Sequence, residues 1–144
     1  MKKFLLLICL FGIQQLRAQK YILLDQRISM PVKYSNTITT ADKFKGYFPV
    51  EAKNIRQFIK VLEEIASKLS GNNLSEKPKQ YEMGCVQFAG NIISLAKGNR
   101  IDYVLTSDCD DLKISMHLCD AKLTNADNAY FVNTWISYIK NGIK

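Results

Sequence analysis

The sequence has none of the short motifs that identify most enzymes and cofactor-binding proteins. Its 144 residues contain no glycine-rich phosphate loop, no GxSxG nucleophile turn and no HExxH zinc motif. No two cysteines are spaced as CxxC, which argues against a redox active site and against a zinc ribbon. Residues 19–144 contain no block of consecutive basic residues, so the basic side chains predict a solvated surface rather than a nucleic-acid site. We therefore expect no cofactor and no nucleic-acid partner.

Long hydrophobic runs are also absent, apart from one at the N-terminus that is too short to span a membrane. Residues 4–13 form an apolar run of ten residues, whereas a membrane-spanning helix needs about 20. Two lysines precede this run, and a polar stretch with the small residue Ala18 follows it. This layout predicts a bacterial secretory signal peptide over residues 1–18, cleaved after Ala18. Cys9 is a poor lipidation site because the large Ile8 precedes it. A soluble periplasmic or extracellular protein is expected.

Cleavage would leave 126 residues (144 − 18), which predicts a single globular domain over residues 19–144. Lys2, Lys3 and Arg17 would be lost with the signal peptide, so the mature chain would carry 17 basic and 13 acidic residues, a formal net charge of +4. Residues 19–68 hold nine basic and five acidic side chains, whereas residues 69–144 hold eight of each. The basic first half favours an acidic partner or an anionic envelope surface.

Two amphipathic helices are predicted. Apolar side chains recur at helical spacing over residues 51–69, with charged side chains on the opposite side, and Gly71 is expected to end this helix. A second helix should begin at Thr124, whose hydroxyl can form a capping box with Asp127. Its buried side would be lined by Ala129, Val132, Ile136 and Ile139, with Phe131 and Trp135 at the edges.

Strands are predicted on both sides of the first helix. Residues 20–30 and 32–40 suggest two short strands, or one bent edge strand, separated by Pro31. Phe44, Tyr47 and Phe48 are expected to fold back on the first helix as a hydrophobic lid. Residues 81–120 suggest a four-stranded meander with two-residue turns at 90–91, 98–99 and 110–111.

This register divides the meander into two faces, because directly opposed residues point to the same side of a sheet. The face that gathers most apolar side chains is the predicted core face: Tyr81, Met83, Cys85, Ile92, Ala96, Ile101, Tyr103, Leu105, Ile114, Met116 and Leu118. The predicted fold class is therefore α+β. We expect a two-layer sandwich, in which an antiparallel meander sheet has four central strands plus N-terminal edge strands and two amphipathic helices pack on one face.

The cysteines predict one disulfide. Export would place Cys85, Cys109 and Cys119 in an oxidising compartment, which favours one bond and one remaining thiol. Along an extended strand Cys109 and Cys119 would lie about 23 Å apart, at about 3.3 Å per residue, whereas a disulfide needs Cα atoms within about 7 Å. A Cys109–Cys119 bond is not expected, and the sequence leaves the connectivity otherwise open.

The single histidine, His117, lies on the second face of the predicted sheet, where Cys119 and Asp102 also project. Most structural zinc sites have four protein ligands, so these three side chains do not predict a metal site. The register places neither Cys119 nor Cys85 within the roughly 3 Å of His117 that an activated cysteine nucleophile requires. No catalytic residue is predicted.

The second face also carries an apolar cluster, which we predict to bind a partner together with His117: Val86, Phe88, Ile93, Leu95 and Val104. Alternatively, residues 21–24 or 44–48 cover this cluster within the molecule. The leading hypothesis is a small exported, non-enzymatic binding domain for a protein or cell-envelope component, of which an immunity or inhibitor protein is one instance. The alternatives are a small secreted hydrolase or transferase that uses His117 and carboxylates, and a structural envelope component.

Overall fold

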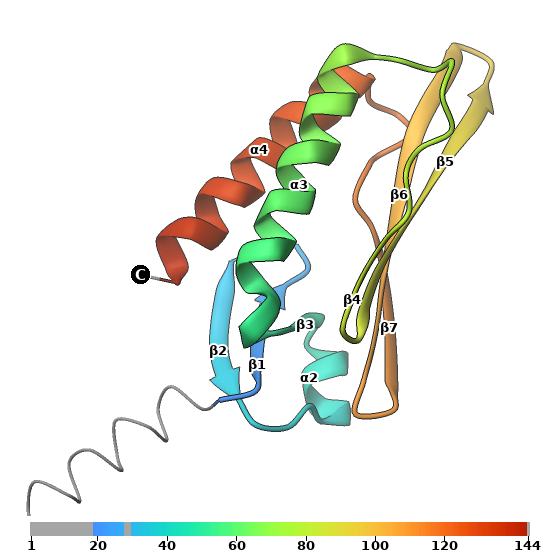
Figure 1. The fold of residues 1–144 in the computed structure, drawn as a ribbon. Helices are drawn as coiled ribbons and strands as arrows, with labels where there is room; N and C mark the ends of the chain where they lie inside the picture. Colours follow the sequence, from blue (N-terminus) through green and yellow to red (C-terminus); the bar gives the residue numbers. More distant parts are fainter. Residues whose placement is uncertain (1–18, 28–29, 144) are drawn as a thin grey trace, which may run out of the picture.

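The computed structural model describes residues 19–27 and 30–143, so the predicted signal peptide, with Cys9 and its cleavage site after Ala18, lies outside the described residues. Two antiparallel sheets and two long helices make up the described part (Figure 1), which confirms the predicted α+β class. No helix in this part of the chain is long and apolar enough to cross a membrane.

Sheet B is the predicted four-stranded meander, with its strands side by side in sequence order: β4 (Tyr81–Met83), β5 (Val86–Leu95), β6 (Gly98–Cys109) and β7 (Leu112–His117). The β6–β7 turn is Asp110-Asp111, as predicted. Both aspartates have positive φ, 50° and 61°, which is the backbone conformation that a two-residue hairpin turn with the right twist requires.

The N-terminal strands form a sheet of their own, sheet A, instead of extending the meander. Its central strand is β1 (Tyr21–Asp25), which pairs with β2 (Pro31–Ser35) on one side and β3 (Tyr47–Glu51) on the other. Pro31 is the first residue of β2, which is an edge strand, and edge strands tolerate proline because one side of their backbone needs no ladder partner.

The prediction that residues 44–48 form a hydrophobic lid on the first helix is wrong, because the aromatic residues of this segment belong to helix α2 (Thr40–Phe44) and strand β3. Phe48 is buried as expected, but it is a residue of strand β3 and so is Tyr47. Phe44 ends the short helix α2 and is 87% exposed. The two aromatic residues of β3 point to opposite faces of the strand, because β3 pairs with β1 over its whole length. Phe48 lies in the main core, and the half-buried Tyr47 packs against the second cluster, which contains Cys109.

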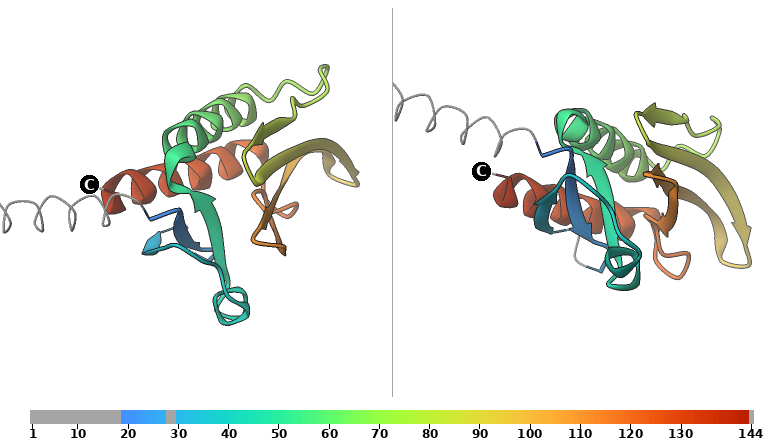
Figure 2. Two further views of the ribbon diagram at one scale, coloured as in Figure 1. Left: turned by 60° about the horizontal axis from the view of Figure 1, so that its bottom comes forward. Right: turned by 90° about the horizontal axis from the view of Figure 1, so that it is seen from below.

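The two long helices lie side by side (Figures 1 and 2). α3 (Ile55–Gly71) follows a single 3₁₀ turn, η1 (Ala52–Asn54), so it starts four residues later than predicted. The left-handed residue that ends it is Asn72 (φ 49°) rather than Gly71. α4 (Asn125–Gly142) is capped by Thr124, and the predicted capping box is formed.

One hydrophobic core joins the helices to both sheets. Ile22 and Leu24 of β1 lie in this core together with the apolar sides of α3, α4 and sheet B. The other face of β1 packs Tyr21 and Leu23 against the end of sheet B, at Cys109. β1 is therefore buried on both of its faces.

The β6–β7 turn is fastened to sheet A by Asp110. The Tyr21 hydroxyl donates a hydrogen bond to its carboxylate at 2.8 Å, and the Ile38 N–H donates another at 3.2 Å. The hydrogen bond from Tyr21 is the main reason that the pKa of Asp110 lies below its usual range. The turn that the sequence predicts thus also connects the two sheets.

Two of the three predicted turns of the meander are wrong. The first turn is Gly84-Cys85, because Met83 pairs with Val86, and β5 runs straight through the predicted turn at 90–91. The second turn lies two residues earlier than predicted, at 96–97. Moving the first turn transfers Val86 and Phe88 from the outer face to the core face, whereas β6 and β7 keep their predicted faces.

Candidate binding surfaces

The predicted partner-binding patch does not form. Val86 and Phe88 are each only 1% exposed and belong to the core. Ile93, Leu95 and Val104 do lie on the outer face of sheet B, with His117 paired opposite Val104. The polar pair Asn91 and Asp102 separates Val104 from Ile93 along the ladder, so these apolar residues make no continuous surface. Residues 21–24, one of the two segments considered as a cover, form β1 of sheet A.

His117 and Asp102 form a pair on the outer face. His117 Nδ1 lies 3.2 Å from Asp102 Oδ2, and the His117 side chain is 68% exposed. The other carboxylate oxygen, Asp102 Oδ1, is buried and has no hydrogen-bond partner among the described residues. Cys119 does not join them, because β7 ends at His117 and Cys119 is buried in the core. Within residues 19–27 and 30–143, no group of three or more His, Cys, Asp or Glu could hold a metal ion.

The cysteines form one disulfide, Cys85–Cys109, and Cys119 remains a buried thiol. This confirms the prediction of one bond and one thiol, and the prediction that Cys109 does not pair with Cys119. The Asp108 N–H donates to the Cys85 carbonyl at 2.9 Å, so the first turn of the meander lies directly beside the end of β6. Sequence reasoning missed this pairing because it placed the first turn six residues later.

Cys119 should be unreactive in the folded protein. Burial raises the pKa of its thiol to about 12, and only the thiolate reacts readily with disulfide reagents. With 5,5′-dithiobis(2-nitrobenzoic acid) at pH 8, a folded protein of residues 19–144 should show almost no free thiol, and the same protein unfolded in guanidinium chloride should show one. Rapid modification of the native protein would contradict the burial of Cys119.

The Cys119 thiol also makes the free energy of unfolding depend on pH in the alkaline range. The folded-state pKa of Cys119 lies above the unfolded value of 9.0, so its contribution to stability is complete below pH 9 and is lost as the pH rises toward 12. Cys119→Ala should remove this part of the decline, measured as the free energy of unfolding in urea between pH 8 and pH 11.

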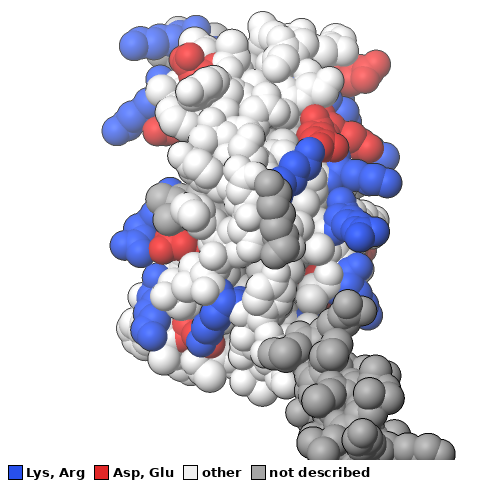
Figure 3. Space-filling view, turned by 90° about the vertical axis from the view of Figure 1, so that its left-hand side faces the viewer, with Lys and Arg blue, Asp and Glu red and all other residues white. Residues whose placement is uncertain are grey.

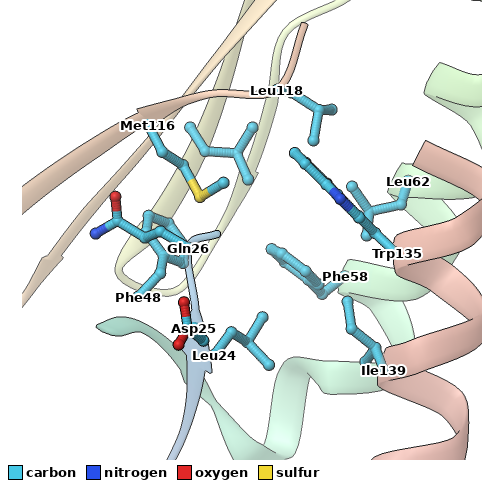
Figure 4. Close-up of a pocket in the computed structure, with 11 residues that line it drawn as sticks. Leu24, Asp25, Gln26, Phe48, Phe58, Leu62, Met116, Leu118, Trp135 and Ile139 are labelled. Atoms are coloured by element: carbon cyan, nitrogen blue, oxygen red, sulfur yellow. The ribbon is translucent and has the colours of Figure 1, made fainter. Parts of the chain in front are cut away.

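An apolar recess lies where the two sheets meet the helices (Figure 4). It measures about 290 Å³, counting the open space at its mouth. Trp135 and Leu118 lie across from Met116, and Asp25 stands at one side. The Asp25 carboxylate accepts three hydrogen bonds from Arg27, which hold the pKa of Asp25 below its usual range. Because the Asp25 carboxylate is already hydrogen-bonded to Arg27, the recess offers mainly apolar contacts. We interpret it as a packing gap between the layers of the core rather than as a binding site.

A more exposed apolar surface lies on α4 and the neighbouring strand β2. Tyr130 is 69% exposed, and Phe131 and Tyr138 are 45% and 41% exposed. Pro31, at the start of β2, lies so close to the end of α4 that a Cβ at Gly142 would be 2.6 Å from it. We call the large exposed apolar and aromatic residues of these segments the α4–β2 face: Met30, Val32, Tyr34, Tyr130, Phe131 and Tyr138.

The α4–β2 face has almost no charged side chains. Figure 3 shows an uncharged band that runs down this side of the molecule, with Lys and Arg side chains along both margins and fewer Asp and Glu. α4 carries two charged residues, Asp127 and Lys140, whereas α3 carries five: Arg56, Lys60, Glu63, Glu64 and Lys68. A surface helix normally has charged residues on its solvent side, as α3 does. α4 exposes aromatic side chains in that position instead.

Most of this face was not predicted from the sequence. Phe131 was expected at the edge of the last helix, but no role was predicted for Tyr130 or Tyr138. The signal was the uncharged run over residues 128–139, which lies between the two charges of the helix. A helix with polar and aromatic residues but no charges on its outer side differs from an ordinary solvated helix.

Comparisons of the chain with protein-family models, curated proteins and solved structures gave no match.

Proposed function

We propose that the protein is a small exported, non-enzymatic binding domain that engages an acidic protein partner through the α4–β2 face. The observation that carries this proposal is the group of exposed aromatic side chains on α4, whose solvent-facing side has no charged residue between Asp127 and Lys140. Exposed apolar patches of this kind usually mark contact surfaces. Tyr, Phe and Met are enriched at the centres of protein–protein interfaces, where charged residues are depleted. The Cys85–Cys109 disulfide supports a periplasmic or extracellular location.

The charges around the face suggest the chemistry of the partner. Lys and Arg side chains predominate along its margins, and residues 19–143 contain 16 basic residues (17 − Lys144) against 13 acidic ones. A partner with an apolar centre and an acidic rim would complement this surface. If the partner were a second copy of this chain, the basic margins of the two faces would lie against each other, which is unfavourable. A lipid surface would have to cover the polar Asn133 and Ser137, which are exposed between the aromatic residues of α4. These arguments favour a binding domain for an acidic protein, and an immunity or inhibitor protein is one instance of that class.

Position-dependent photocrosslinking in the exporting cell tests this proposal. A benzophenone amino acid at Phe131 probes the α4–β2 face, and the same amino acid at Ile93 probes the outer face of sheet B. We expect the probe at Phe131 to give one crosslinked acidic protein and the probe at Ile93 not to. Tyr138→Lys in the Phe131 probe protein should reduce this crosslink about ten-fold or more, because an unpaired charge would be buried at the centre of the interface.

The other outcomes of this experiment would overturn the proposal. A crosslink from Ile93 alone would place the contact on the outer face of sheet B. Crosslinks between two copies would identify self-association, as expected of a structural envelope component, and crosslinks to lipid alone would identify a membrane surface. Lys113→Gln, on the outer face of sheet B, is the matched control for a changed charge and should leave the Phe131 crosslink unaltered.

A second candidate function is favoured by one observation, the pairing of His117 with Asp102. A carboxylate that orients an exposed imidazole is typical of a general base, so a small hydrolase or transferase would use His117 in this role. His117→Ala separates the two candidates. An enzyme should lose its turnover, whereas a binding domain should keep its crosslink from Phe131.

A further inference from the structure

The most exposed large hydrophobic side chain in the described part of the chain is that of Phe44, at the end of the short helix α2. Phe44 is 87% exposed, whereas the other exposed large hydrophobic residues range from 36% to 69%. An aromatic ring in water gains free energy by entering an apolar phase. A single exposed hydrophobic residue is ordinary in a folded protein. Phe44 differs from the others in the charges beside it and in its position on the molecule.

Two lysines flank the Phe44 ring. Lys43 and Lys45 are exposed, and neither forms an ion pair with a carboxylate of the described chain. The one carboxylate of α2, on Asp42, is 3% exposed; it accepts hydrogen bonds from Thr39 and pairs with Lys33 at 2.8 Å. The charge that α2 and its last turn present to the outside is therefore only positive. We call Lys43, Phe44 and Lys45 the α2 tip.

The backbone of the α2 tip is fixed by hydrogen bonds. A capping box begins the helix. The Lys45 N–H donates to the Ala41 carbonyl at 3.0 Å, and the Gly46 N–H donates to the Lys43 carbonyl at the same distance. The Gly46 carbonyl accepts the Gln26 N–H at 2.9 Å, which ties the end of the tip to the segment after β1. These backbone groups stay paired when the tip approaches an apolar phase, where unpaired ones would be costly.

The α2 tip also projects from the body of the molecule. α2 and α3 adjoin opposite ends of β3, so α2 lies away from the two long helices (Figure 2). In Figure 1, β2 and the end of α4 lie on the left, whereas α2 lies at the lower right. The tip can therefore touch a flat surface while the α4–β2 face remains accessible.

A tip of this size suits a lipid surface better than a protein. A stable protein interface buries about 800 Å² on each partner, and three side chains on a projecting turn are too few to supply that area. A bilayer surface requires no such area. One aromatic ring can enter the boundary between headgroups and acyl chains, while lysine side chains of this length keep their ammonium groups among the phosphates.

We propose that the α2 tip attaches the protein to the surface of an anionic phospholipid bilayer. The Phe44 ring enters the headgroup boundary, and Lys43 and Lys45 pair with lipid phosphates. One ring and two charges give weak, reversible attachment, because stable anchoring needs a second strong signal. The α2 tip is separate from the α4–β2 face, so this inference does not depend on the proposed function. It adds that the binding domain works at a membrane surface.

Co-sedimentation with sucrose-loaded vesicles tests the inference. A protein of residues 19–144 is used, because the apolar run over residues 4–13 would bind vesicles by itself, and both core clusters lie within the shorter chain. We expect it to bind vesicles of phosphatidylcholine and phosphatidylglycerol in equal parts, and to bind phosphatidylcholine alone much more weakly. Binding should also weaken as sodium chloride is added.

Phe44→Ala is the decisive variant, because it removes an exposed ring that the fold does not need. It should lower the partition coefficient on the anionic vesicles about ten-fold or more. Lys43→Gln and Lys45→Gln should each lower it about five-fold. The conservative variant Phe44→Trp should keep binding, and its fluorescence emission should shift to shorter wavelength on anionic vesicles by more than that of Trp135 in the unmodified protein.

Two variants serve as matched controls and should bind as the unmodified protein does. Lys122→Gln removes an exposed charge just before α4, whose start lies at the opposite end of the molecule from α2 (Figure 1). Phe131→Ala removes an exposed aromatic ring from the α4–β2 face.

No binding to anionic vesicles, equal binding to both kinds of vesicle, or equal binding by the unmodified protein and Phe44→Ala would overturn the inference. Binding that is lost in Phe131→Ala but kept in Phe44→Ala would place the membrane contact on the α4–β2 face, and would overturn the acidic protein partner as well. Failure of the Phe131 crosslink alone would leave the vesicle result unchanged, so the two proposals fail separately.

Discussion

Replacing Phe88 with alanine should lower the free energy of unfolding by about 3–5 kcal/mol, the usual cost of truncating a fully buried aromatic side chain. The Phe88 ring lies 5.4 Å from the Phe58 ring of α3 and 6.2 Å from the Tyr81 ring of β4, measured between centroids. Its removal would leave a cavity between α3 and sheet B that these rings cannot fill without losing other contacts. Equilibrium unfolding in urea, followed by circular dichroism, measures the loss.

Ile93→Ala is the matched control, because Ile93 belongs to the same strand but faces away from the core. Truncation at this half-buried position should cost less than about 1 kcal/mol. Phe88→Leu keeps much of the buried volume and should recover a large part of the loss, which also provides a measurement if Phe88→Ala does not fold. Equal losses at Phe88 and Ile93 would mean that the strand register read from the sequence, with Phe88 on the outer face, is the correct one.

Removing the disulfide should lower the free energy of unfolding by about 3 kcal/mol, because the bond restricts the unfolded chain. The linked cysteines are 24 residues apart in sequence. Cys85→Ala combined with Cys109→Ala should destabilise the protein as much as reduction does, apart from the small effect of the lost side chains. Unfolding in guanidinium chloride with and without reductant measures both effects.

Cys119→Ala is the control for this experiment, since it removes a thiol but no disulfide. Its stability should still fall on reduction by the same amount as that of the unmodified protein. Stability that is insensitive to reductant, or peptide mapping that joins Cys109 to Cys119, would contradict the observed connectivity.

The helices and the last two strands of sheet B were predictable because their signals are local. The capping box at Thr124 depends on residues three positions apart, and the turn at Asp110-Asp111 depends on two adjacent residues. The alternating sides of β6 and β7 follow from that turn alone. These elements agree with the sequence because no distant contact is needed to define them.

Gly90 shows why the first turn of the meander was misplaced. Glycine followed by asparagine is a strong turn signal, but Gly90 is a glycine because Tyr103 and Pro78 lie against it. The true turn contains Gly84, which has a φ of 56°. A sequence alone does not distinguish a glycine that bends the chain from one that allows close packing, because the second reason lies in residues far along the chain.

The separate N-terminal sheet and the α4–β2 face also depend on contacts between distant segments. β1 pairs with β3 across the intervening β2 and α2, and period-two patterns do not reveal which strands are neighbours. The unbroken burial of β1 is typical of a strand covered on both faces. Whether Tyr130 or Tyr138 is covered depends on what packs beside α4, so the sequence showed an uncharged helix side without showing that it is exposed.

The order of the cysteines bears on how the protein is oxidised. In a chain that crosses a membrane with its N-terminus first, Cys85 and Cys109 both emerge before Cys119. An oxidase that acts on the emerging chain would therefore meet the native pair before the competing thiol is accessible. If the proposed export holds, the native disulfide should then form by oxidation alone, without correction by a disulfide isomerase.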